Sequence, residues 1–138
     1  MLSDDLSRCV VLNIVVAART LLRRYDAKLK PYGVTVQQFA LLGALRAYPC
    51  APVAVLAERI VLDRTSLTRN LDLMERKGLV RRVAAAGNLR LCELTGKGEA
   101  LLEELIPQWQ ASKADLLHGI SERDADTFFK VVRHIARD

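Results

Sequence analysis

Apolar side chains recur every three or four residues along most of this chain, which is the spacing of one face of a helix. The first such stripe predicts a long helix over residues 3–29, with Ser3 as its N-cap. Its members are Leu6, Val10, Ile14, Ala17 and Leu21, and Val11, Val15 and Leu22 widen it to a second face. A helix of this length spans about 40 Å and extends beyond one small domain. We therefore expect a second copy of the chain to cover it.

Three shorter helices follow the KPYG segment at 30–33, which ends the first helix. The pattern predicts them over 36–47, 53–60 and 64–77. Thr35 and Asp63 are the expected N-caps of the first and third, and Gly78 is the expected end of the third.

After Gly78 the helical spacing gives way to short strand-like runs at 79–80 and 89–94, with AAAGN at 84–88 as the hairpin tip. Thr95 and Ser121 then precede two more helices, over 96–118 and 122–137. The order predicts a mainly α fold with a small β-hairpin wing, a winged helix-turn-helix with long helices at both ends. Within the single unit 1–138, we expect 33–95 to bind DNA and the helices of 1–32 and 96–138 to form a dimer.

Charge changes this picture because it is unevenly distributed. The chain has 138 residues, of which 27% are charged and 51% hydrophobic, a composition that excludes a disordered chain. Residues 64–90 contain seven Lys and Arg but only two acids, while the net charge of the whole chain is +5. All of the excess positive charge therefore lies in this window. Such a local excess favours a polyanionic partner, although a solvated basic face would look the same.

The segment DRTSLTRN at 63–70 lies inside this basic window. In a helix, one face would carry Leu67, Leu71 and Met74. The other would carry polar side chains, and Thr and Ser are poor choices for helix stability alone. Arg can read guanine and hydroxyls can contact bases or phosphates, so this face suits the major groove. The candidate DNA-binding residues of this helix are Arg64, Thr65, Ser66, Thr68 and Arg69. An ordinary amphipathic surface helix is the alternative.

The chain resembles the multiple antibiotic resistance regulator (MarR) family of bacterial winged helix-turn-helix repressors. Three motifs, in the family's order, carry the resemblance: KPYGVTVQQF at 30–39, DRTSLTR at 63–69 with ERKGLV at 75–80, and LTGKG at 94–98. The resemblance implies a homodimer that binds double-stranded DNA at a pseudo-palindromic operator and responds to a small-molecule or oxidant signal. It also implies that the wing contacts a minor groove or phosphates.

The wing departs from the family pattern, because its tip is short and lacks the usual Asp-Arg-Arg run. The wing's role would then fall to Asn88 and Arg90, with Arg81 and Arg82 of the first strand as phosphate partners.

Cys9, Cys50 and Cys92 are too few and too widely spaced for a disulfide framework or a zinc site. Some members of the family sense oxidants through a cysteine of the first helix, which makes Cys9 a candidate redox sensor. A small, buried packing residue is the more ordinary interpretation of Cys9. We expect no catalytic residues, no metal and no cofactor.

Taken together, these patterns predict a sequence-specific transcriptional regulator, a repressor relieved by a signal. A winged-helix module that binds an acidic protein and a thiol peroxidase built on Cys9 are the alternatives. No apolar stretch approaches the roughly 20 residues that span a bilayer, and no leader segment is evident, so we expect a cytoplasmic protein without a membrane segment.

Overall fold

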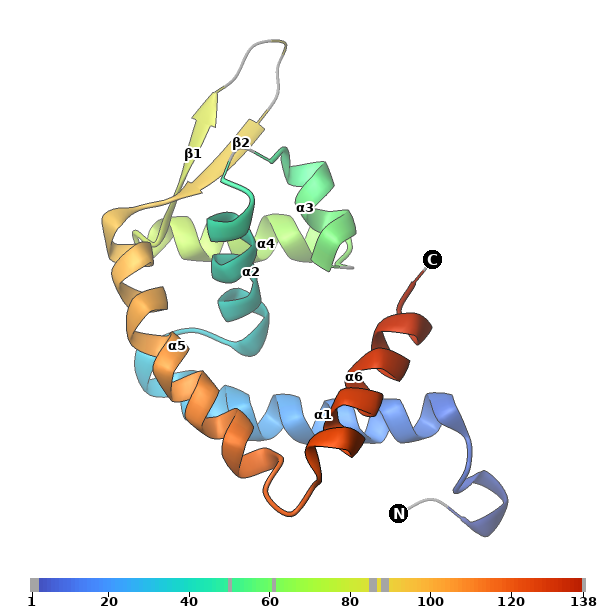
Figure 1. Ribbon diagram of the computed structural model, residues 1–138. Coiled ribbons are helices and arrows are strands. Elements are labelled where there is room, and N and C mark those ends of the chain that lie inside the picture. The colour runs from blue at the N-terminus through green and yellow to red at the C-terminus, as the bar shows by residue number, and fades with distance from the viewer. Residues whose placement is uncertain (1–2, 50, 61, 85–86, 88–89, 138) are drawn as a thin grey trace. The chain divides into compact units, whose positions relative to one another are not determined.

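The computed structural model describes residues 3–49, 51–60, 62–84, 87 and 90–137. In chain order its elements are η1 (Asp4–Leu6), α1 (Val10–Leu29), η2 (Lys30–Tyr32), α2 (Val36–Ala47), α3 (Val53–Ile60), α4 (Arg64–Arg76), β1 (Val80–Ala84), β2 (Arg90–Leu94), α5 (Gly96–Leu116) and α6 (Glu122–Ile135) (Figure 1). The mainly helical fold with a hairpin wing is confirmed. No helix in the described part of the chain is both long enough and apolar enough to span a membrane.

The chain forms two compact units, Met1–Leu102 and Glu103–Asp138, with the boundary inside α5. The first unit contains α1–α4, the hairpin and the start of α5, and the second contains the rest of α5 and α6. The division expected from the sequence, with 33–95 as the DNA-binding part, stays a prediction.

The first helix begins later than the sequence predicted. A short turn of 3-10 helix, η1, comes first, and Cys9 rather than Ser3 is the N-cap of α1. The side-chain amide of Asn13 donates to the carbonyl oxygens of both Ser7 and Cys9, each over 2.8 Å. Polar side chains that bond to nearby backbone in this way compete with helical hydrogen bonds, which explains the interruption.

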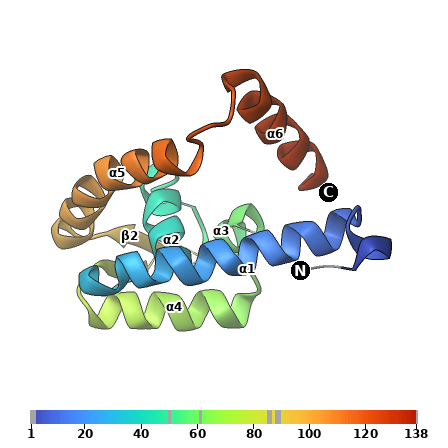
Figure 2. The ribbon, with the colours of Figure 1, turned by 90° about the horizontal axis from the view of Figure 1, so that it is seen from below.

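The core of the first unit lies between α2, α3, α4 and the hairpin. Each of these helices contributes leucines that are almost fully buried, and Cys92 of β2 is buried with them. The helix residues are Leu41, Leu42, Leu45, Leu56, Leu67, Leu71 and Met74. The N-terminal half of α1, by contrast, extends past α2 and α4 (Figure 2). The buried residues of α1, Tyr25 and Leu29, lie near its C-terminal end, and Val11 is 67% exposed.

The wing is an antiparallel hairpin in which Val80 pairs with Leu94 and Ala84 with Arg90. Pro52, just before α3, forms an isolated bridge with Leu91 on β2. The start of α3 is thereby tied to the wing.

A tight joint connects α4, β1 and α5. Gly78 ends α4 with a positive φ of 74°, a conformation that favours glycine. The Thr95 hydroxyl donates to the Gly78 carbonyl over 2.5 Å and accepts from the backbone N–H of Gly98 over 3.1 Å. Gly98 lies directly against the backbone carbonyl of Leu79.

In the second unit, α5 ends at Leu116 and the chain then turns at Gly119, whose φ is 83°. The Ser121 side chain caps α6 by accepting from the N–H of Asp124. The rings of Phe128 and Phe129 meet edge to face, with centroids 5.7 Å apart. Phe128 is nevertheless 59% exposed, and Ala125 is the one buried residue of α6.

Candidate nucleic-acid interface

The recognition helix expected from the sequence is α4, and its first turn is fixed by Asp63. The Asp63 carboxylate accepts from both the backbone N–H and the hydroxyl of Ser66, each over 2.8 Å. The N–H bond and then the hydroxyl bond hold the pKa of Asp63 below its ordinary value. An anionic cap also interacts favourably with the positive end of the helix dipole. The predicted N-cap is therefore confirmed.

Burial of one side of α4 determines which residues face outward. Leu67, Leu71 and Met74 pack into the core. Residues on the opposite side surround a shallow hollow of about 410 Å³, lined by Arg64, Thr65, Thr68, Arg69 and Asp72. Neither Arg64 nor Arg69 forms an ion pair within the part of the chain that the structure describes.

The structure thus brings together four of the five predicted residues of this helix. Ser66, the fifth, is half-buried and its hydroxyl donates to Asp63, so its contacts are those of a capping residue. Asp72, which the sequence places on the same polar face without making it a candidate DNA contact, also lines the hollow.

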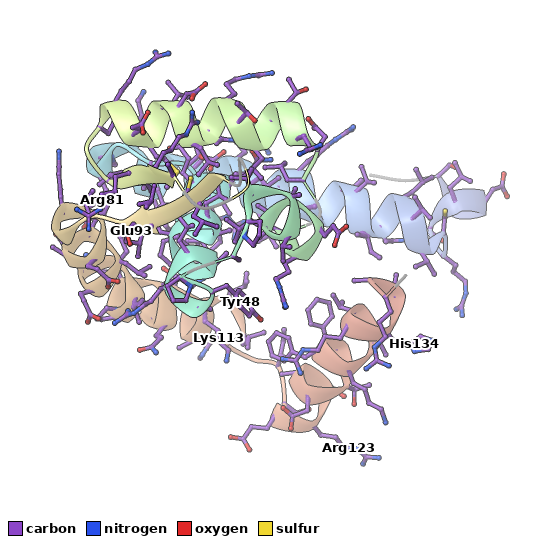
Figure 3. The ribbon with its side chains drawn as sticks, turned by 90° about the horizontal axis from the view of Figure 1, so that it is seen from above. Tyr48, Arg81, Glu93, Lys113, Arg123 and His134 are labelled. Atoms are coloured by element: carbon purple, nitrogen blue, oxygen red, sulfur yellow. The ribbon has the colours of Figure 1, made fainter. Side chains whose placement is uncertain are left out.

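The two arginines of β1, both predicted to contact phosphates, each form an ion pair within the chain. Arg81 pairs with Glu93, its direct neighbour on β2, through Nε and Oε1 at 2.5 Å, and its side chain is 66% exposed (Figure 3). Arg82 instead pairs with Asp72 of α4, also at 2.5 Å, and is 27% exposed. Arg82 therefore connects the wing to α4.

The surroundings of Arg82 explain its charge state. Burial, the largest influence, lowers the pKa of the guanidinium, but the hydrogen bond and charge of Asp72, with the charges of Glu75 and Cys92, raise it above the ordinary value overall. Burial raises the pKa of the neighbouring Cys92 thiol, and Arg82 opposes that rise. The Arg82 guanidinium therefore keeps its positive charge beside α4.

Of the two predicted wing-tip residues, Arg90 is the first residue of β2 and pairs with Ala84. Asn88 lies outside the described residues.

A second set of contacts holds the other flank of α4, and the sequence analysis missed it. The side-chain amide of Gln38, on α2, donates to the Asn70 side-chain oxygen over 3.2 Å. The Lys77 ammonium donates to the Gly33 carbonyl. The Thr35-x-x-Gln38 pattern is typical of a capping box and could have pointed to Gln38, but nothing in the pattern indicates its partner 32 residues away.

Cys9 is half-buried at the N-terminal end of α1. The described residues contain no group of three or more His, Cys, Asp or Glu side chains that could hold a metal ion.

Comparison with known proteins agrees with this geometry. Residues 32–91 match a protein-family model described as the MarR family. The chain is 33% identical to the transcriptional regulator MosR of M. tuberculosis, solved in complex with DNA, over 94% of this chain and 100% of that chain, with a TM-score of 0.74.

Two more distant structures share the fold. One is a mutant MarR from E. coli complexed with operator DNA, 23% identical over 98% of this chain and 100% of that chain, with a TM-score of 0.84. The other is PcaV from Streptomyces coelicolor in complex with its natural ligand, 24% identical over 99% of this chain and 97% of that chain, with a TM-score of 0.82. Given the helix order, the wing and the extent of the MosR match, the chain belongs to the MarR family of winged helix-turn-helix, DNA-binding transcriptional regulators.

Proposed function

We propose that this regulator reads DNA sequence with the outer face of α4 placed in a major groove. The observation that carries the proposal is the hollow lined by Arg64, Thr65, Thr68, Arg69 and Asp72, in which neither arginine forms an ion pair with any residue that the structure describes. Unpaired guanidinium groups beside hydroxyls are suited to guanine edges, thymine methyls and phosphates. The relative MosR was crystallised in complex with DNA, which supports DNA as the ligand of this chain.

Electrostatic affinity falls mainly to the wing in this proposal. Arg90 and the exposed Arg81 would contact phosphates, together with Asn88, whereas Arg82 would act through its link to Asp72. The Arg81–Glu93 pair is exposed and therefore weak, so a phosphate can replace Glu93 at low cost.

The functional form would be a homodimer on a pseudo-palindromic operator. The exposed apolar residues of α1 and α6, among them Val11 and Phe128, support this part because a second copy would bury them. Two-fold symmetry then requires half-sites about one helical turn apart, ~34–36 Å.

Regulation would be repression in the cytoplasm, relieved by a small molecule or an oxidant. The ligand-bound PcaV structure motivates the small-molecule form. Cys9, half-buried at the start of α1, motivates the oxidant form. Operator release by hydrogen peroxide in the wild type but not in Cys9→Ser would support the oxidant form, and equal release in both would contradict it.

The test of DNA reading compares variants on two duplexes. A footprint beside the chain's own gene supplies the cognate site, and a scrambled duplex of equal composition is the reference. Thr68→Ala and Arg69→Ala should reduce the preference for the cognate site, since a base-reading Arg contributes about 1–3 kcal/mol of discrimination. Arg90→Ala should weaken both duplexes alike and reduce the slope of affinity against salt by about one unit.

Arg123→Ala serves as the control because it removes the same charge from α6. If Arg90→Ala abolished the preference while Thr68→Ala and Arg69→Ala retained it, the reading element would be the wing. Weak binding without any preference in the wild type would favour the protein-interaction alternative.

A further inference from the structure

We infer that the buried amide of Gln38 is a positioning residue for DNA reading, because it sets the orientation of α4 through Asn70. The inference rests on the proposed function, in which the outer face of α4 reads bases. Gln38 itself is only 4% exposed and lies on α2, so it is not a DNA contact.

The side-chain oxygen and the amide nitrogen of Gln38 are both hydrogen-bonded. Its side-chain oxygen accepts from the backbone N–H of Thr35 over 3.2 Å, and its amide nitrogen donates to Asn70 over 3.2 Å. Rotating the amide by half a turn would place a donor against a donor at Thr35 and an acceptor against an acceptor at Asn70. The contact therefore has one favourable arrangement, and the Thr35 capping box fixes it from the α2 side.

Asn70 passes this constraint to the reading turns of α4. Its amide nitrogen donates to the backbone carbonyl of Ser66 over 3.0 Å, and Ser66 is bonded in turn to the N-cap Asp63. A continuous set of hydrogen bonds thus leads from the N-terminus of α2 to the N-terminus of α4. Thr68 and Arg69 lie within the span of α4 that this set encloses.

Apolar packing alone would not fix the same orientation. The hydrophobic contribution of the leucines and methionine that pack α4 into the core depends on the apolar area removed from water, so a small rotation that keeps them buried changes this contribution little. A buried amide pair is directional and costly to leave unpaired. Such pairs are known to select one register among alternatives of similar apolar burial.

The expected consequence is a loss of discrimination larger than the loss of affinity. Base-edge hydrogen bonds depend steeply on distance and angle, whereas phosphate attraction does not. Gln38→Leu and Asn70→Ala should each reduce the ratio of cognate to scrambled affinity by about fivefold to tenfold. The double variant should lose little more than either single variant, because the two side chains act through one contact.

One matched variant separates positioning from stability, and a second tests the bond from Asn70 to Ser66. Thr35→Ala removes the capping hydroxyl from the same helix but leaves Gln38 opposite Asn70, so it should lower Tm and keep the affinity ratio. Asn70→Asp keeps an acceptor for Gln38 but replaces the donor to the Ser66 carbonyl by a carboxylate oxygen, so its ratio should fall as in Asn70→Ala, and its negative charge weakens binding to both duplexes. All variants are titrated as the intact chain, with Tm measured in parallel.

An unchanged ratio in folded Gln38→Leu and Asn70→Ala would overturn the inference, and so would an equal fall in Thr35→Ala. If Gln38→Leu does not fold, Asn70→Ala decides alone. A wild-type protein without preference for the cognate duplex would contradict the proposed function itself. The affinity ratio of the wild type is therefore measured before that of any variant.

Discussion

Two helices of nearly equal length, α4 and α6, differ in how far their apolar side chains are buried. The apolar residues Leu67, Leu71 and Met74 of α4 are buried within its own unit, and both flanks of the helix are hydrogen-bonded to neighbouring elements. On α6 the large apolar residues Phe128, Val131 and Ile135 are about half exposed or more. The apolar face of α4 is buried within a single chain, whereas the apolar face of α6 stays exposed in a single chain. In the proposed function, DNA reading by α4 and dimerisation through α6 therefore place different demands on these two sequences.

The largest expected effect comes from placing a charge on the open surface. Phe128→Asp should weaken dimerisation roughly 100-fold, because it removes apolar burial and forces a carboxylate into the interface. Sedimentation over a range of concentrations measures the change. Lys130→Gln, which lowers the net charge by the same amount on the other side of α6, is the control and should dimerise normally. An unaltered dimer in Phe128→Asp would remove α6 from the interface.

A smaller effect should follow from cutting the link between the wing and α4. Arg82→Met leaves Asp72 without its cation in a partly buried site and should cost about 1–2 kcal/mol of unfolding free energy. Arg81→Met removes an exposed cross-strand pair and should cost less than about 0.5 kcal/mol. Urea denaturation distinguishes the two. Equal costs would mean that the Arg82–Asp72 pair does not strengthen the attachment of α4.

The smallest effect concerns the cap of α4. Because Asp63 has a pKa below its ordinary value in the folded chain, its ionised form stabilises that state. Asp63→Ala should lower Tm by roughly 1–3 °C at pH 7. The difference from wild type should shrink as the pH falls below about 4, where the carboxyl becomes protonated in the unfolded and then in the folded state. Asp63→Asn retains a cap without a titrating group, so its Tm difference from Asp63→Ala should not change with pH.

Local patterns in the sequence predicted the elements well because helix spacing and caps are properties of neighbouring residues. The bounds of α2 and α3 are confirmed, as are the caps Thr35, Asp63 and Ser121. The start of α1 was wrong because the competing bonds of Asn13 leave no trace in apolar spacing.

For the site, the outward face of α4 followed from the apolar face, since one determines the other. The ion-pair partners of the wing arginines, by contrast, could not be predicted from the sequence pattern. Glu93 and Asp72 neutralise Arg81 and Arg82 only after the hairpin has formed and packed against α4. Charge counted along the chain therefore overestimates the positive charge that the wing can offer to DNA.

The close approach of Gly98 to the Leu79 carbonyl has a consequence for how this chain can evolve. A Cβ at residue 98 would overlap the carbonyl oxygen of Leu79, which is backbone and cannot rotate away. Gly43 and Gly96 have no atom near the place where a Cβ would stand and no unusual φ. Random substitution followed by selection for operator binding should therefore retain only glycine at 98, while alanine becomes common at 43 and 96. The second glycine of the LTGKG segment is kept by the space available to it, and no ligand or nucleotide contact is needed to account for it.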